Sequence, residues 1–165
     1  MSQVSLTYNP VEDRMLLIVS NNINHPQWWL TRHMCKKLLE MLNAELTLQY
    51  ELDKIQSLYK ENKTTQEASF ADKHQQALHD AAGRTEIQKK STPAKPDALL
   101  TTRISLDKKP DNLVALYIYS RESHGICLDL DNNGLHIFLD MMIKVAVKGE
   151  WGLKQARSIE NKLIE

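Results

Sequence analysis

The sequence predicts an α+β fold in which an antiparallel sheet is built from two β-meander-plus-helix units with a central helical insert. Near each end of the chain, short segments of strand-like alternation lead into an amphipathic helical pattern. A helical segment and a polar stretch separate these two ends. We therefore expect a single domain of residues 1–165 with three parts, 1–60, 61–98 and 99–165.

The first part, 1–60, is expected to form a β-hairpin, a third strand and a long helix. Apolar residues alternate with polar ones at Val4, Leu6 and Tyr8, and the turn-forming stretch 9–13 separates them from the apolar run 15–19. Thr31 follows a short strand at 28–30 and is placed to cap the helix. Apolar residues then recur with helical spacing to residue 58, which predicts one helix or two with a bend near Asn43.

The second part, 61–98, is expected to contribute a helix and a linker. Apolar residues fall on one face of a weaker helical pattern over 67–82. Residues 83–96 are polar and rich in Lys and Pro, which is typical of a linker or a mobile loop.

The third part, 99–165, is expected to form a three-stranded antiparallel meander followed by helices. Its three strand-like segments are 99–107, 113–119 and 126–130. An amphipathic pattern over 135–146 then predicts a helix that Gly149 ends, and 153–164 predicts a short C-terminal helix.

Composition and charge exclude several classes of protein. Hydrophobic residues make up 42% of the chain and charged residues 25%, which excludes a disordered chain and a membrane protein. Lys plus Arg equals Asp plus Glu at 21 each, so no overall field attracts nucleic acid or an anionic membrane. Charged residues at 12–14 interrupt the place where a signal peptide needs an apolar run, so we expect a cytoplasmic protein. Cys35 and Cys127 are expected to be buried, reduced thiols.

Two resemblances accompany these patterns. The strand at 126–130, the polar turn after it and the helix 135–147 resemble the last strand and helix of the single-stranded DNA-binding transcriptional coactivator and Whirly group. This resemblance implies one or two such units per chain and binding of single-stranded nucleic acid. The segment 13–32, with its Trp-Leu-Thr-Arg, is similar to small bacterial proteins of unassigned function.

A calcium-loop spacing begins at Asp129. The oxygen-bearing residues at positions 1, 3, 5 and 12 of such a loop are Asp129, Asp131, Asn133 and Asp140, with Gly134 at position 6. Position 9 is Ile137, which offers no side-chain oxygen, and position 12 is Asp rather than the longer Glu. We therefore favour the alternative that 132–134 form a turn and a helix N-cap.

Motifs for catalysis are missing from the sequence. None of the six histidines stands in a metal-ligand spacing with a carboxylate, and His74 and His79 are five apart, on different faces of a helix. The chain has no nucleophile motif and no phosphate-binding glycine loop. We expect no catalytic residues and no cofactor.

Two surfaces are candidates for binding. Residues 84–109 carry seven basic and three acidic residues, and Tyr117 and Tyr119 share one face of a strand nearby. The candidate nucleic-acid residues are Lys89, Lys90, Arg103, Lys108, Lys109, Tyr117 and Tyr119. The alternative is a solvated loop beside tyrosines that cap the core.

The second candidate surface involves consecutive tryptophans. Trp28 and Trp29 must face opposite ways on a strand, so one of them can anchor an interface; the alternative is that a helix and the long insert cover the sheet on both sides. The function that we favour is non-catalytic binding to a protein partner or to a second copy of the chain, with single-stranded nucleic-acid binding and then calcium binding as alternatives. No membrane partner is expected.

Overall fold

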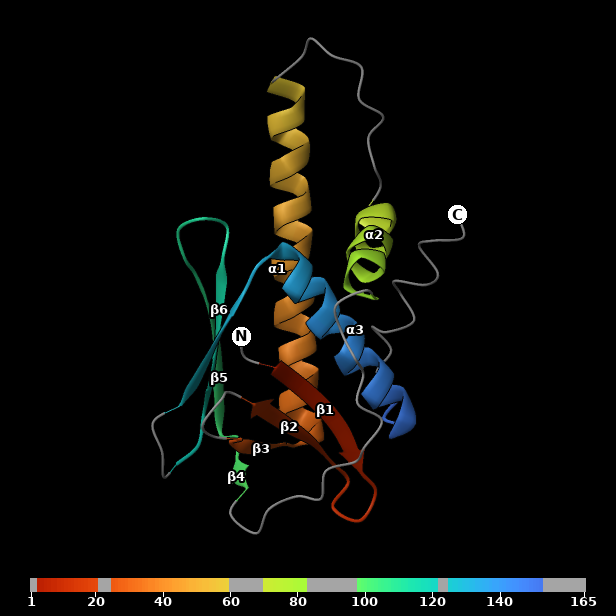
Figure 1. Ribbon diagram of the computed structural model, residues 1–165, viewed down its shortest axis with the longest axis vertical. Coiled ribbons are helices and arrows are strands. Elements are labelled where there is room, and N and C mark those ends of the chain that lie inside the picture. The colour runs from red at the N-terminus through yellow and green to blue at the C-terminus, as the bar shows by residue number, and fades with distance from the viewer. Residues whose placement is uncertain (1–2, 21–24, 60–69, 83–97, 122–124, 153–165) are drawn as a thin grey trace.

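The computed structural model describes residues 3–20, 25–59, 70–82, 98–121 and 125–152. It contains two sheets with helices between and beside them (Figure 1). The α+β class is therefore confirmed, and each three-stranded antiparallel meander is followed by its own helix, as the two-unit arrangement predicts.

The first sheet has the order β1-β2-β3-β4. β1 (Gln3–Asn9), β2 (Arg14–Ser20) and β3 (Gln27–Leu30) form an antiparallel meander. β4 (Leu99–Leu100) joins β3 in parallel, so this sheet is mixed. The hairpin between β1 and β2 forms because Asn9 Oδ1 accepts hydrogen bonds from the backbone N–H groups of Val11 and Glu12, at 2.9 and 3.2 Å.

The long helix α1 (Arg32–Tyr59) follows β3 directly. Thr31 caps it as expected, since Thr31 Oγ1 accepts a hydrogen bond from the backbone N–H of Met34 at 3.3 Å. The alternative of two helices with a bend near Asn43 is wrong, because α1 runs unbroken for 28 residues (Figure 1). The insert helix α2 (Phe70–Ala82) lies beside it. The linker expected at 83–96 lies outside the described residues.

The second sheet contains β5 (Arg103–Lys108), β6 (Val114–Tyr119) and β7 (Ile126–Leu130), all antiparallel. The single strand expected at 99–107 is wrong. Thr101 donates its N–H to the carbonyl of Trp29 at 2.9 Å, whereas Thr102 donates to Tyr119 in the other sheet at 2.8 Å. The chain therefore passes from one sheet to the other between these two threonines.

The helix α3 (Asn132–Lys148) follows β7. Its N-cap is Asp131, one residue before the expected turn, and Asp131 Oδ1 accepts a hydrogen bond from the N–H of Gly134 at 2.7 Å. Gly149 ends the helix as expected, since its N–H donates to the carbonyl of Val145 and the N–H of Glu150 donates to that of Val147, both at 3.1 Å. The C-terminal helix expected at 153–164 lies outside the described residues.

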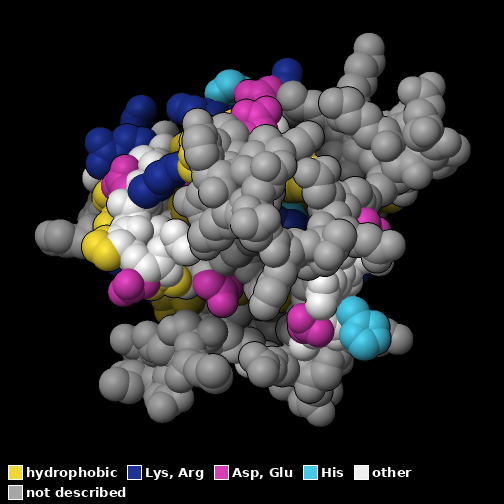
Figure 2. All heavy atoms as spheres, turned by 90° about the horizontal axis from the view of Figure 1, so that it is seen from above, with side chains coloured by type: hydrophobic (Ala, Val, Ile, Leu, Met, Phe, Trp, Pro, Cys, Tyr) yellow, Lys and Arg dark blue, Asp and Glu magenta, His cyan; other side chains and the backbone are white. Residues whose placement is uncertain are grey.

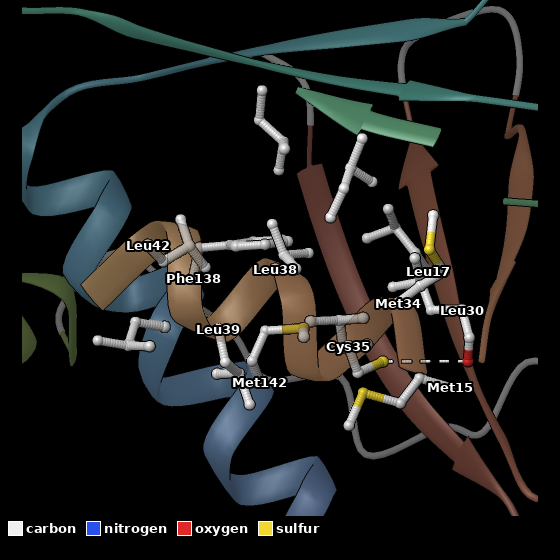
Figure 3. Close-up of a cluster of buried hydrophobic side chains, with 14 of the residues drawn as sticks. Met15, Leu17, Leu30, Met34, Cys35, Leu38, Leu39, Leu42, Phe138 and Met142 are labelled. Atoms are coloured by element: carbon white, nitrogen blue, oxygen red, sulfur yellow. Dashed lines mark hydrogen bonds between the residues drawn. The ribbon is translucent and has the colours of Figure 1, made fainter. Parts of the chain in front are cut away.

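The core is formed where α1 packs between the first sheet and α3 (Figure 3). The N-terminal half of α1 contributes the side chains of Met34, Cys35, Leu38, Leu39 and Leu42. Cys35 Sγ points toward the carbonyl of Leu30 at 4.0 Å, and burial raises the pKa of its thiol to about 12. Cys35 is therefore a buried thiol with no tendency to ionise. No helix among the described residues is long and apolar enough to span a bilayer.

Candidate functional site

The second sheet has one face on the core and one face toward solvent. Ile104, Leu116, Ile118 and Leu128 point inward and are buried. Because side chains alternate along a strand, the residues between them form an opposite face, which we call the outer face. It consists of Arg103, Ser105, Asp107, Ala115, Tyr117, Tyr119, Cys127 and Asp129. The described helices all lie on the other side of this sheet (Figure 1).

Strand register arranges the outer face in three rows. The first row holds Arg103 beside Tyr119. The second row holds Ser105, Tyr117 and Cys127 side by side, with Tyr117 on the central strand. The third row holds Asp107, Ala115 and Asp129.

An aromatic ladder occupies the first two rows. The rings of Tyr117 and Tyr119 stack with centroids 6.2 Å apart and planes 13° apart. The guanidinium carbon of Arg103 lies 4.2 Å from the centroid of the Tyr119 ring. Such a cation–π contact contributes about 0.5–1 kcal/mol at an exposed site. The three side chains therefore hold one another in place before any partner binds.

Gly125 leaves room for the Tyr119 ring at the start of β7. A Cβ atom at this position would lie 2.5 Å from Tyr119 Cδ1 and 2.5 Å from the carbonyl oxygen of Ile118. Glycine is thus the residue that lets the ring lie across the end of the strand.

The lysines of the candidate set are neutralised by carboxylates. Lys109 Nζ lies 2.6 Å from Asp129 Oδ1, and this hydrogen bond lowers the pKa of Asp129. Lys108 Nζ lies 3.2 Å from Glu45 Oε1 on α1. Lys89 and Lys90 lie outside the described residues. In Figure 2, Lys and Arg side chains gather along one edge of the molecule with Asp and Glu side chains between them.

Two charged groups of the outer face have no ion-pair partner within the described part of the chain. Among the residues that the structure describes, Arg103 contacts the Tyr119 ring but no carboxylate, and Asp107 contacts no cation. They lie four residues apart on β5, which corresponds to about 13 Å along a strand. The outer face therefore has a basic first row and an acidic third row.

Cys127 is exposed on the outer face, so the expectation that both thiols are buried is wrong. β7 is an edge strand, and Cys127 alternates with the inward-facing Leu128. Its Sγ lies 3.6 Å from Asp129 Oδ1. Partial burial, together with the charge of Asp129, raises the pKa of this thiol. Cys127 is consequently not activated as a nucleophile.

The two tryptophans take opposite sides of β3. Trp28 is 2% exposed and belongs to the core cluster, where it faces Leu17 across the strand pair. Trp29 is half-buried on the other side, opposite Leu16. Of the two, only Trp29 has ring surface available to a partner.

The four calcium-loop positions are not brought together. α3 begins at Asn132, so Asn133 lies in its first turn and Asp140 lies about 12 Å further along the axis. Asp131 is used as the N-cap, Asp129 binds Lys109, and Asp140 Oδ2 lies 2.6 Å from Lys144 Nζ. Within the described residues, no three His, Cys, Asp or Glu side chains are arranged to hold a metal ion.

A pair of histidines joins α2 to α3, which no local pattern indicated. His74 Nδ1 lies 2.8 Å from His136 Nδ1, and His136 is 3% exposed. One ring must donate and the other accept, so the contact requires a neutral acceptor ring. Burial, followed by the charge of His74, lowers the pKa of His136 to about 4, and burial also lowers the pKa of His74.

A second unpredicted cluster surrounds Asp13 in the β1–β2 turn. Its carboxylate accepts hydrogen bonds from Trp151 Nε1 at 2.7 Å, the Tyr8 hydroxyl at 2.9 Å and Arg32 at 2.9 Å. The indole and phenol bonds are the main reasons why the pKa of Asp13 is lowered. These contacts tie the hairpin to the start of α1 and to the chain after α3, which is a structural role.

No protein-family model, no curated protein and no solved structure matches this chain.

Proposed function

We propose that this chain is a non-catalytic binding protein that recognises another protein through the outer face of β5, β6 and β7. The observation that carries this proposal is the ladder of Arg103, Tyr119 and Tyr117, which is stacked on the side of the sheet away from the described helices. Tyrosine and arginine are the residue types that most often dominate the binding energy of protein interfaces.

Charge favours a protein partner over a nucleic acid. A protein that binds the phosphate backbone gains most of its affinity from lysines and arginines that replace condensed counterions. Lys108 and Lys109 are instead paired with Glu45 and Asp129. A face with paired lysines, and with one arginine and one aspartate that have no ion-pair partner among the described residues, suits the mixed polar surface of a protein.

The cysteines support a reducing setting for this function. Both are free, Cys35 in the core and Cys127 on the outer face. Free thiols are the usual state in the cytoplasm, which is the location that we propose.

Single-stranded nucleic acid is the second candidate, because stacked tyrosines on an open sheet are also how bases are bound without sequence preference. Each stacked base contributes about 1–3 kcal/mol. The two candidates share Tyr117 and Tyr119 and differ in the need for cations.

The experiment compares three forms of the tagged chain as bait in an extract of the cells that produce it. These are the wild type, the double variant Tyr117→Ala with Tyr119→Ala, and Glu40→Ala, a control on the exposed side of α1. We expect the wild type and the control to retain the same proteins and the double variant to lose them. Identical retained proteins in all three forms would remove the outer face as the recognition surface.

A titration with a short fluorescent oligonucleotide tests the second candidate. Binding that weakens with salt, at a log-log slope of about 0.7 per neutralised phosphate, and that is lost in the tyrosine double variant supports nucleic acid as the partner. The protein-recognition proposal predicts no measurable binding at physiological salt.

A further inference from the structure

We propose that the outer face binds a second copy of this chain, so that two sheets pack face to face around a two-fold axis. This inference rests on the proposed function, because it names the partner of the same surface. Its starting point is the unequal distribution of charge, with Arg103 in the first row and Asp107 in the third.

A two-fold axis can place the basic first row of one copy against the acidic third row of the other. If the axis runs across the strands through the second row, the first row of one copy lies over the third row of the other, and β5 lies over β5. Arg103 of each copy then meets Asp107 of the other, and two equivalent ion pairs form. Both residues are exposed and have no ion-pair partner within the described ranges, so no existing pair is broken.

The central row fits the same arrangement. Ala115 of the third row is 0% exposed, so the central strand contributes Tyr117 and Tyr119 to the contact. Tyr117 of the second row lies over its own equivalent, so the axis places aromatic surface at the centre of the contact and charge at its edges. The rows are thus compatible in charge.

The dimensions predict a weak dimer. Three strands over residues 103–107 and their partners cover about 14 by 17 Å, or about 240 Å² per copy, which is well below the roughly 800 Å² per partner of a standard stable interface. We therefore expect dissociation in the micromolar range or weaker, with monomers present at low concentration.

A charge-exchange experiment tests the contact on the full-length chain. Sedimentation velocity is measured from low micromolar to near-millimolar concentration for the wild type, Arg103→Asp, Asp107→Arg and the double exchange. Each single change places like charges opposite each other and is expected to lower the association constant at least about tenfold. The double exchange restores opposite charges and is expected to restore the dimer. Lys37→Asp, on the exposed side of α1, is the matched control and is expected to dimerise as the wild type does.

Several outcomes would overturn the inference. A wild type that stays monomeric over the whole range excludes the dimer, and so does a dimer that neither single exchange weakens. Asp107→Arg keeps the contact between Arg103 and Tyr119, so it remains informative if Arg103→Asp perturbs the ladder. If the wild type is monomeric but the tyrosine double variant still loses the captured proteins, the dimer is excluded and the proposed function stands. If the wild type is monomeric and the tyrosine double variant captures the same proteins as the wild type, both proposals are excluded.

Discussion

The histidine pair between α2 and α3 predicts a specific loss of stability on acidification. The perturbation is His136→Gln on α3, compared with the wild type and with His79→Gln, an exposed residue of the insert helix α2. Glutamine can still bond the ring of His74 but does not titrate, so the variant removes the proton equilibrium and retains a polar partner.

The magnitude follows from the pKa of His136, which burial lowers from 6.5 to about 4. Between these two pH values the unfolded chain binds a proton that the folded chain does not, so stability falls as the pH falls from 6.5 toward 4. One pKa unit corresponds to about 1.4 kcal/mol, which gives an upper limit of about 3 kcal/mol. Screening through the half-exposed His74 reduces the expected loss to about 2 kcal/mol.

Other charges around the pair act on the folded-state pKa values, which determine how far the loss continues as the pH falls. Asp140 of α3 favours the protonated form of His74, whereas Lys144 of α3 opposes it. Lys73 of α2, which is held by Asp53 of α1 at 2.9 Å, opposes protonation of His136. Burial is the largest cause for both rings and favours the neutral pair, so the loss is expected to continue as the pH falls well below 6.5.

The assay is urea unfolding at several pH values between 7 and 4. The wild type and His79→Gln are expected to lose about 2 kcal/mol more than His136→Gln over this range. Parallel pH profiles for the wild type and His136→Gln would refute the reasoning, because they would show that the pair does not resist protonation.

Three further predictions concern the second unit. Asp131→Ala removes the N-cap of α3 and is expected to lower the free energy of unfolding by about 0.5–2 kcal/mol in urea unfolding, while no loss would exclude the cap. Gly125→Ala forces a Cβ against the ring of Tyr119 and is expected to cost about 1–3 kcal/mol and to change the near-ultraviolet circular dichroism of tyrosine, whereas an unchanged spectrum would contradict the close contact. Calcium at millimolar concentration is expected to leave the melting temperature unchanged, and an increase that Asp129→Ala abolishes would show that the loop binds the ion after all.

Local patterns were sufficient for most elements of the fold. Alternation located the strands of both meanders, and helical spacing located α1 and α3. The alternation in 99–107 did not reveal that Leu99 and Leu100 belong to the other sheet, because both sheets require the same period. Only the hydrogen bonds of Thr101 and Thr102 to different sheets distinguish the two segments.

The candidate site was predictable in part. The shared face of Tyr117 and Tyr119 follows from the strand period, and the structure stacks the two rings. The pairing of Lys108 with Glu45 was not predictable, because it depends on how α1 crosses the second sheet. The histidine pair was not predictable either, because His74 and His136 are 62 positions apart and meet only through the packing of α2 on α3.

The calcium spacing is compatible with two different local structures. A loop folds its ligands around an ion, whereas a helix spreads the same residues along an axis. Because Asp131 is the N-cap, α3 begins at Asn132, and Asn133 and Asp140 lie on a helix rather than in a loop. Capping chemistry and ligand chemistry use the same residue types, so sequence alone did not separate them.

The central claim is that the outer face of the second sheet contacts another macromolecule. It is tested most directly by placing a photo-cross-linking amino acid at Ser105, in the middle of that face, and at Glu40 on α1 as a control, in the cells that produce the protein. The account predicts a discrete cross-linked protein adduct from position 105 and none from position 40. Adducts from position 40 with none from position 105 would contradict it.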